Sequence, residues 1–305
     1  MKHTVKVTIL LVFFFFMAQF VGLLVINQYI DHKKTIESKE VVFKPLPYGF
    51  ERPEIKNQST SFIYITLAVL TGTFLVLMLV KFEKQFVWKY VFFAAVWSTL
   101  SIALAAFINP IAAAVLALIV SVLRLYRPNL IIQNISEIFI YGGLASFVVN
   151  IFNLFAAFML LIVISIYDFI AVFKTKHMIK LAEFQSKSKV FAGLLVPYQR
   201  DKIPVTAMPK PQTGNMPKNT PKSSVAVLGG GDIGFTLIFA GVVMKGLMLK
   251  ETILAGFLKT LIIPVFVSFA LLMLLLKGQK NKFYPAMPVL SLGCFVGYMV
   301  IWLLG

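Results

Sequence analysis

Residues 225–235, with the sequence VAVLGGGDIGF, open a long apolar segment and yet contain three glycines and a carboxylate. From Ile233 to Val243 the segment carries no further charge. Such a segment is typical of a membrane-spanning helix, because a bilayer core of about 30 Å requires about 20 apolar residues. Asp232 is therefore an acid placed where an ionised side chain is costly.

The whole chain has the composition of a membrane protein. Apolar residues make up 59% of its 305 positions and charged residues 13%, and the mean hydropathy is +0.87. Soluble domains contain about 45–50% apolar and about 25% charged residues, so a water-soluble protein is excluded. The net charge of +17 does not indicate a nucleic-acid partner here, because basic residues collect in the cytoplasmic loops of membrane proteins.

Several kinds of site are absent from the sequence. Cys294 is the one cysteine, so an intrachain disulfide is excluded. The three histidines are scattered, and no P-loop or Rossmann glycine pattern opens a strand–helix unit. We therefore expect no metal and no cofactor.

The apolar stretches predict an all-α, multi-pass membrane protein with nine transmembrane helices. The first stretch has an apolar run from Val7 to Ile26, longer than a signal peptide's core, and no cleavage site follows, so we expect it to be retained. The third and fourth stretches are separated by an Asn-Pro turn signal. The stretches are 7–27, 61–80, 87–108, 110–124, 132–149, 151–173, 225–246, 252–276 and 285–304.

The distribution of basic residues predicts the orientation. With the N-terminus in the cytoplasm and the C-terminus outside, cytoplasmic segments hold 20 of the 29 lysines and arginines. We divide the chain into a six-helix part, 1–174, a basic, proline-rich cytoplasmic loop, 175–224, and a three-helix part, 225–305. The composition of the loop predicts disorder, although 174–191 could lie on the membrane surface.

Three acids lie clearly within apolar stretches, and two of them share a depth. Asp168 is six residues before Lys174, about 9 Å from the end of its helix, and Asp232 is about 10 Å past Val225, at 1.5 Å per residue. The two helices are consecutive and antiparallel, so both acids lie near the cytoplasmic face. For the third acid, Glu137, we expect a structural partner such as Asn134 or a hydroxyl.

Two carboxyl groups at one depth suggest a catalytic pair. Like charges a few ångströms apart do not both ionise easily and so share a proton. One carboxylate can then activate a water while the protonated one polarises a carbonyl, which is the chemistry of aspartic proteases. On the acids alone, an ion or proton pathway is an equally good hypothesis, and a non-catalytic scaffold is a third that leaves their insertion cost unexplained.

Three motifs resemble those of presenilins and signal peptide peptidases. Tyr167-Asp168 resembles the YD motif of their sixth helix, and Gly229-Gly230-Gly231-Asp232 resembles the GxGD motif of their seventh. Pro285-Ala286-Met287 stands where their PAL motif belongs, with methionine in place of leucine. The cytoplasmic N-terminus matches presenilins, and the chain looks most like an archaeal or other microbial homologue. Prepilin-type peptidases share GxGD but lack the third motif.

The resemblance implies an intramembrane aspartyl endopeptidase with Asp168 and Asp232 as its catalytic residues. Its substrates would be transmembrane segments of other proteins, and the enzyme would lie in the lipid bilayer, in the cell membrane if the source is prokaryotic. The oligomeric state stays open, a homo-oligomer included. As residues that shape the site or contact the substrate we select Tyr167, Gly229, Gly231, Pro285, Ala286 and Met287.

Overall fold

The computed structural model describes residues 4–174, 181, 184–185, 188, 190–197, 225–278 and 284–304. Within these residues the fold consists of helices, one two-stranded sheet and one isolated β-bridge. The elements of the first part are α1 (Val5–Tyr29), α2 (His32–Ser38), η1 (Pro47–Gly49), η2 (Gln58–Thr60), α3 (Ser61–Lys81), α4 (Gln85–Ala105), α5 (Pro110–Tyr126), α6 (Leu130–Val148), η3 (Val149–Ile151) and α7 (Leu154–Phe173). They are followed by β1 (Gly193–Pro197), β2 (Val225–Gly229), α9 (Gly230–Leu247), α10 (Ile253–Thr260), α11 (Ile262–Lys277) and α12 (Met287–Leu303).

Each of the nine predicted apolar stretches overlaps one or two helices of the structure. In the described part of the chain, seven helical spans are long and apolar enough to cross a bilayer, and α5 and α12 are apolar helices of 17 residues each. The stretch 252–276 is divided at Leu261 into α10 and α11. The division has a local cause: in a continuous helix the ring of Pro264 would clash with the backbone carbonyl of Thr260, four residues earlier.

The structure corrects the start of the seventh stretch. Residues 225–229, predicted as helical, form β2, which pairs antiparallel with β1 in a register that sets Gly193 opposite Gly229 and Pro197 opposite Val225. Apolarity alone does not distinguish a strand from a buried helical turn. Strand β1 belongs to the loop for which we predicted disorder. The proline-rich part of that loop, 198–224, lies outside the described residues.

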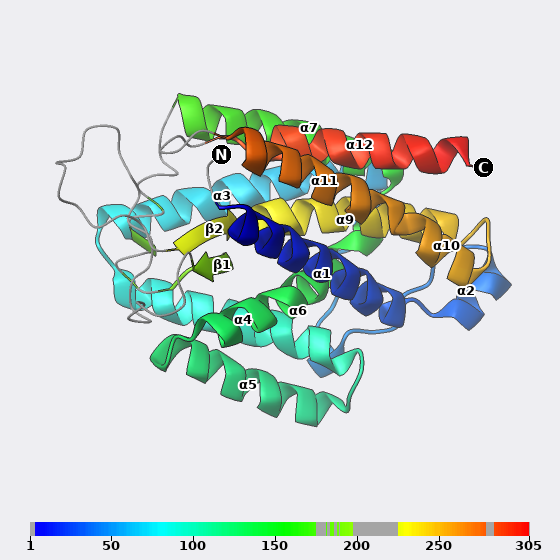
Figure 1. The fold of residues 1–305 in the computed structure, drawn as a ribbon. Coiled ribbons are helices and arrows are strands. Elements are labelled where there is room, and N and C mark those ends of the chain that lie inside the picture. The colour runs from blue at the N-terminus through cyan, green and yellow to red at the C-terminus, as the bar shows by residue number, and fades with distance from the viewer. Residues whose placement is uncertain are drawn as a thin grey trace.

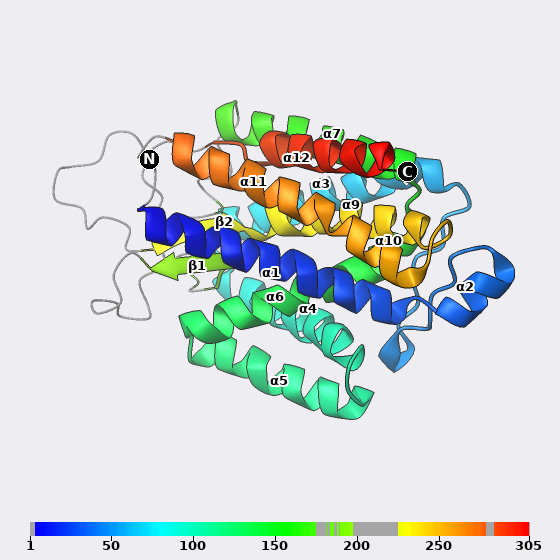
Figure 2. The ribbon, with the colours of Figure 1, turned by 45° about the vertical axis from the view of Figure 1, so that its right-hand side comes forward.

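Helix α9 lies in the middle of the bundle. It contacts α1, α6, α7, α10, α11 and α12. Helix α5, in contrast, has its main contacts with α4 and α6 and lies at the edge of the bundle (Figures 1 and 2). The sheet, the end of α7 and the beginnings of α9 and α12 lie together at one end of the bundle, on the left in Figure 1. Helix α1 begins at that end and α12 finishes at the other.

Small residues allow the closest helix contacts. Gly293 and Gly297 on α12, which have GxxxG spacing, pack on Ile263, Phe266 and Val267 of α11. Ser291 on the same helix instead lies 2.9 Å from the hydroxyl of Ser165 on α7. Helices inside a bilayer associate largely through such van der Waals packing, since lipid is as apolar as their side chains.

Replacing Gly143 with alanine is expected to destabilise the bundle by about 3 kcal/mol or more, at the upper end of overpacking effects. A Cβ on Gly143 of α6 would lie 1.9 Å from the backbone oxygen of Thr99 on α4, an atom that no rotamer change can move away. Gly72→Ala on α3 is the matched control, because nothing lies within 4 Å of its added Cβ. Unfolding in detergent would measure both, and equal stabilities would contradict the expected clash.

Candidate active site

Asp168 lies in the last turns of α7, five residues before that helix ends. The side chain of Asn153 caps the start of α7 by accepting from the N–H of Ala156, so the helix has a defined beginning. Asp168 is only 6% exposed. Its Oδ2 accepts a hydrogen bond of 3.1 Å from the backbone N–H of Met287, and the backbone of Ala286 contributes a second interaction.

Asp232 lies in the first turn of α9, because the helix begins at Gly230 rather than near Val225. The position differs from the prediction, which placed this acid two turns inside its helix. A carboxylate in the first turn of a helix interacts favourably with the helix dipole. Asp232 is half-buried, at the point where β2 passes into α9 without an intervening loop.

The two acids are brought together as expected for neighbouring antiparallel helices. Helices α7 and α9 are in contact, and the carboxyl groups of Asp168 and Asp232 are near enough to interact electrostatically. Such an interaction is much stronger inside a protein than in water, because the local dielectric constant is lower. The arrangement therefore provides two interacting carboxyl groups at one end of the membrane bundle.

The third motif contacts Asp168 from α12. Ala286 is the N-cap residue of α12, Met287 is its first residue and is buried, and α12 contacts both α7 and α9. Pro285 precedes the helix and is half-buried. The contact to Asp168 is made by backbone atoms, so it does not depend on whether residue 287 is leucine or methionine.

We expect Met287→Leu to change kcat and KM for cleavage by less than about threefold, because volume-conserving core substitutions are tolerated and the N–H that binds Asp168 is kept. The variant restores the leucine of the resembling motif. Cleavage of a single-span peptide in detergent would measure it. A loss of tenfold or more would show that the methionine side chain itself has a role.

The glycines before Asp232 differ in what surrounds them. A Cβ on Gly229 would lie 3.4 Å from Oδ2 of Asp232, and one on Gly231 would meet only the ring of Phe235, at 3.7 Å. A Cβ on Gly230 would lie 2.5 Å from the hydroxyl of Tyr141. The glycine that packing requires is thus Gly230, which sequence analysis had not selected, while Gly229 and Gly231 leave space beside the carboxylate.

Comparison with known proteins decides the family. A family model described as signal-peptide peptidase, presenilin aspartyl protease matches residues 21–305. The chain belongs to this family. It is therefore a multi-pass integral membrane protein and an aspartyl protease, a hydrolase of peptide bonds, and the resemblance carried by the three motifs is confirmed.

Solved structures of the family share the fold. The chain is similar to a presenilin family intramembrane aspartate protease crystallised in space group C222, with 21% identity over 97% of this chain and 99% of that chain and a TM-score of 0.57. A structure described in the same words, in space group P2, gives 17% identity over 97% of both chains and the same TM-score. Among curated proteins, no relative matches.

The hydroxyl of Tyr167, the first residue of the YD motif, forms a hydrogen bond with α3. It donates to Thr73 of α3 at 3.3 Å. Two residues earlier, the hydroxyl of Ser165 lies 2.9 Å from that of Ser291 on α12. Residues 165–168 thus connect α7 to α12 and to α3, and Asp168 is the residue of the YD motif that faces the site.

Gln19 on α1 is a buried polar residue near the site that sequence analysis missed. Its Nε2 donates to the backbone carbonyl of Ile233 at 2.9 Å and to Oγ1 of Thr236 at 2.8 Å. The hydroxyl of Thr236 in turn donates to the backbone carbonyl of Asp232 at 2.8 Å. These bonds tie α1 to the turn that carries Asp232. The only signal in the sequence was an isolated amide within the apolar stretch 7–27.

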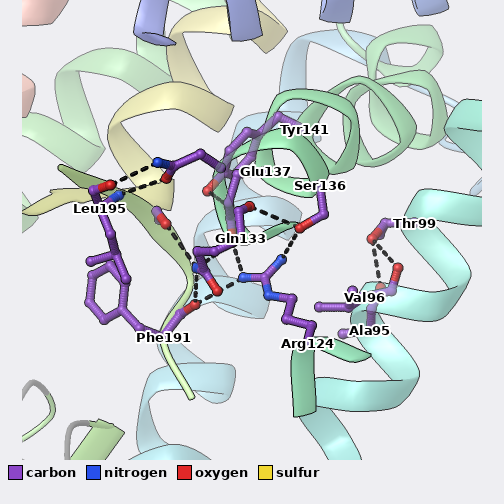
Figure 3. Close-up of polar contacts among 12 residues, drawn as sticks. Ala95, Val96, Thr99, Arg124, Gln133, Ser136, Glu137, Tyr141, Phe191 and Leu195 are labelled. Carbon is purple, nitrogen blue, oxygen red and sulfur yellow. Dashed lines mark hydrogen bonds and ion pairs between the residues drawn. The ribbon is translucent and has the colours of Figure 1, made fainter. Parts of the chain in front are cut away.

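Glu137 has a partner that sequence analysis also missed. Its carboxyl group forms a buried ion pair with Arg124 of α5 and accepts a hydrogen bond from Tyr141, one turn further along α6 (Figure 3). Arg124 also donates to Ser136 at 3.0 Å. The hydroxyl partner was expected, whereas Asn134 instead exchanges two hydrogen bonds with the backbone of Leu195 in β1, at 2.7 and 2.9 Å.

Proposed function

We propose that the protein is an intramembrane endopeptidase in which Asp168 and Asp232 activate the water that hydrolyses a peptide bond of a transmembrane substrate. The observation that carries the proposal is the meeting of these two carboxyl groups, from adjacent antiparallel helices, with a backbone N–H of the third motif on one of them. Membership of an aspartyl protease family supports it.

The mechanism uses one proton shared by two carboxyl groups. The ionised carboxyl takes a proton from a water molecule, whose oxygen attacks the scissile carbonyl carbon, while the protonated carboxyl donates to the carbonyl oxygen. The tetrahedral intermediate collapses as the nitrogen accepts a proton and leaves as an amine. The acids act as a unit, so neither has a fixed role. The Met287 N–H holds the Asp168 carboxyl in place through the cycle.

The sheet beside the acids suits an extended substrate. A helical substrate hides its amides and must unwind before attack, and unwound backbone in lipid requires hydrogen-bond partners. Side chains of α6 bind the outer edge of β1: Gln133 donates to the carbonyl of Gly193, and Asn134 exchanges two bonds with Leu195. The other strand, β2, leads directly to Asp232, so a substrate strand added along β2 would reach the acids.

The glycines and Pro285 fit this arrangement. Gly229 and Gly231 leave space for a substrate backbone beside Asp232. Pro285 lacks an N–H and stands before α12, where the chain is not helical, so backbone near it is accessible to an extended substrate. We assign these residues to substrate contact and Ala286 and Met287 to orientation of Asp168.

The proposal includes the orientation in the membrane. We place the N-terminus in the cytoplasm and the C-terminus outside after nine crossings, counting the two 17-residue helices α5 and α12 as membrane spans. The excess of lysine and arginine in the segments at the end that holds the sheet supports this placement. The peptide bond would then be cut near the cytoplasmic face.

The test uses the purified full chain in liposomes with a labelled peptide that has one transmembrane segment. Mass spectrometry of the products is expected to locate the cut within or next to the membrane segment. A parent protein that leaves the peptide intact and conducts ions would instead favour the pathway hypothesis. An intact peptide without ion flux would favour a scaffold.

A further inference from the structure

A polar chain joins the helices at the edge of the bundle to the first turn of α9. Arg124 of α5 pairs with Glu137 of α6, and Glu137 accepts from Tyr141. The ring of Tyr141 then lies against Gly230, where an added Cβ would be 2.5 Å from the phenol oxygen. Gly230 is the residue at which α9 begins, two positions before Asp232.

The same chain holds the segment before β1. Arg124 and Gln133 both donate to the carbonyl of Phe191, each at 2.9 Å (Figure 3). The next residue, Ala192, accepts a 3.2 Å hydrogen bond from the N–H of Gly230. Two routes therefore lead from the buried ion pair to Gly230, one through the Tyr141 ring and one through the backbone of 191–192.

A buried ion pair at this position holds the helices together at a high desolvation cost. The side chains of Arg124 and Glu137 are 3% and 2% exposed, and removing two charges from water commonly costs more than their attraction returns. Apolar residues of similar size would fill the space between α5 and α6 at lower cost. The pair offers directed hydrogen bonds to specific atoms, which apolar residues do not supply.

We infer that Arg124, Glu137 and Tyr141 are positioning residues for proteolysis, which set the first turn of α9 and the strand pair relative to Asp168. They act through Gly230 and the segment 191–193 and do not themselves meet the substrate. The inference rests on the proposed function of Asp168 and Asp232. Its energetic basis is that a displacement of reacting groups by about 1 Å can reduce a rate by about a hundredfold.

The test compares two equally buried tyrosines, one beside the first turn of α9 and one remote from it. Tyr141 and Tyr29 are each 5% exposed, and each donates one buried hydrogen bond, Tyr141 to Glu137 and Tyr29 to the carbonyl of Ile102 at 2.7 Å. We expect Tyr141→Phe to lower kcat about tenfold with KM within twofold. Tyr29→Phe, which alters a contact remote from Asp232, is expected to leave kcat within twofold at a similar melting temperature.

The outcomes separate this inference from the proposed function. An uncleaved peptide with the parent protein would reject the proposed function itself. With an active parent, equal kcat values for the two phenylalanine variants, or a loss carried by KM alone, would overturn the positioning role. If Tyr141→Phe fails to fold, Arg124→Lys is the variant that tests the positioning role. Lysine keeps the positive charge but lacks the planar guanidinium that donates to Ser136, Glu137 and Phe191 together. A tenfold lower kcat supports the inference, and an unchanged kcat overturns it.

Discussion

Replacing Asp232 with asparagine is expected to lower the cleavage rate by a factor on the order of 10⁴, and Asp168→Asn by a similar factor. Asparagine has nearly the shape of aspartate but neither gives up nor shares a proton, so the remaining acid can no longer alternate between base and acid. Because the two acids act as a unit, the double variant is expected to be no slower than either single variant.

The measurement is the initial rate of appearance of cleaved single-span peptide in liposomes, with folding checked by thermal unfolding. Asp31→Asn is the matched control, since this carboxyl caps α2 outside the membrane helices by accepting from the N–H of Lys34 at 3.3 Å. It is expected to cleave within twofold of the parent. Undiminished cleavage by either Asp168→Asn or Asp232→Asn would reject the catalytic pair.

Glu137→Leu is expected to destabilise the protein by about 3–5 kcal/mol, the cost of leaving a buried charge without its partner. The substitution strands the guanidinium of Arg124 between α4, α5 and α6, where it lies 5.0 Å from the ring centre of Phe92. Replacing both partners, as Arg124→Met with Glu137→Leu, is expected to recover most of that loss, because no buried charge remains.

Unfolding in a detergent series would measure these free energies, with a second ion pair as the control. Lys259 and Glu251 form a more exposed pair, with side chains 30% and 17% exposed. Exposed pairs contribute about 0–1 kcal/mol, so Glu251→Gln should cost no more than about 1 kcal/mol. A Glu137→Leu variant as stable as Glu251→Gln would show that water reaches Arg124 and that its charge is not effectively buried.

The helices and the two acids could be predicted because their signals are local. A run of about 20 apolar residues and a single acid within it are visible one segment at a time, and antiparallel connection then sets Asp168 and Asp232 at one depth. The family motifs also indicated that the segment before α12 belongs to the site. In the structure, the backbone N–H of Met287 donates to the Asp168 carboxyl group.

The features that could not be predicted depend on partners distant in sequence. Strand β2 is as apolar as a helical turn, and only its pairing with β1 shows that it is extended. Glu137 is an isolated acid until α5 brings Arg124 beside it. Gly230 is the variable position of the GxGD motif, so the motif led us to select Gly229 and Gly231 instead. Only the packing of Tyr141 shows that, of the three glycines, Gly230 has the least space for a side chain.

The central place of α9 has a consequence for the integrity of the molecule. Strand β1 and helices α1, α6 and α7 precede residues 198–224, and β2, α9, α11 and α12 follow them. Contacts across this division include the whole strand pair and the packing of α9 on three helices of the first part. A chain severed between 198 and 224 would therefore remain a single particle, two fragments interlocked around one site, and covalent continuity there is not what keeps Asp168 and Asp232 together.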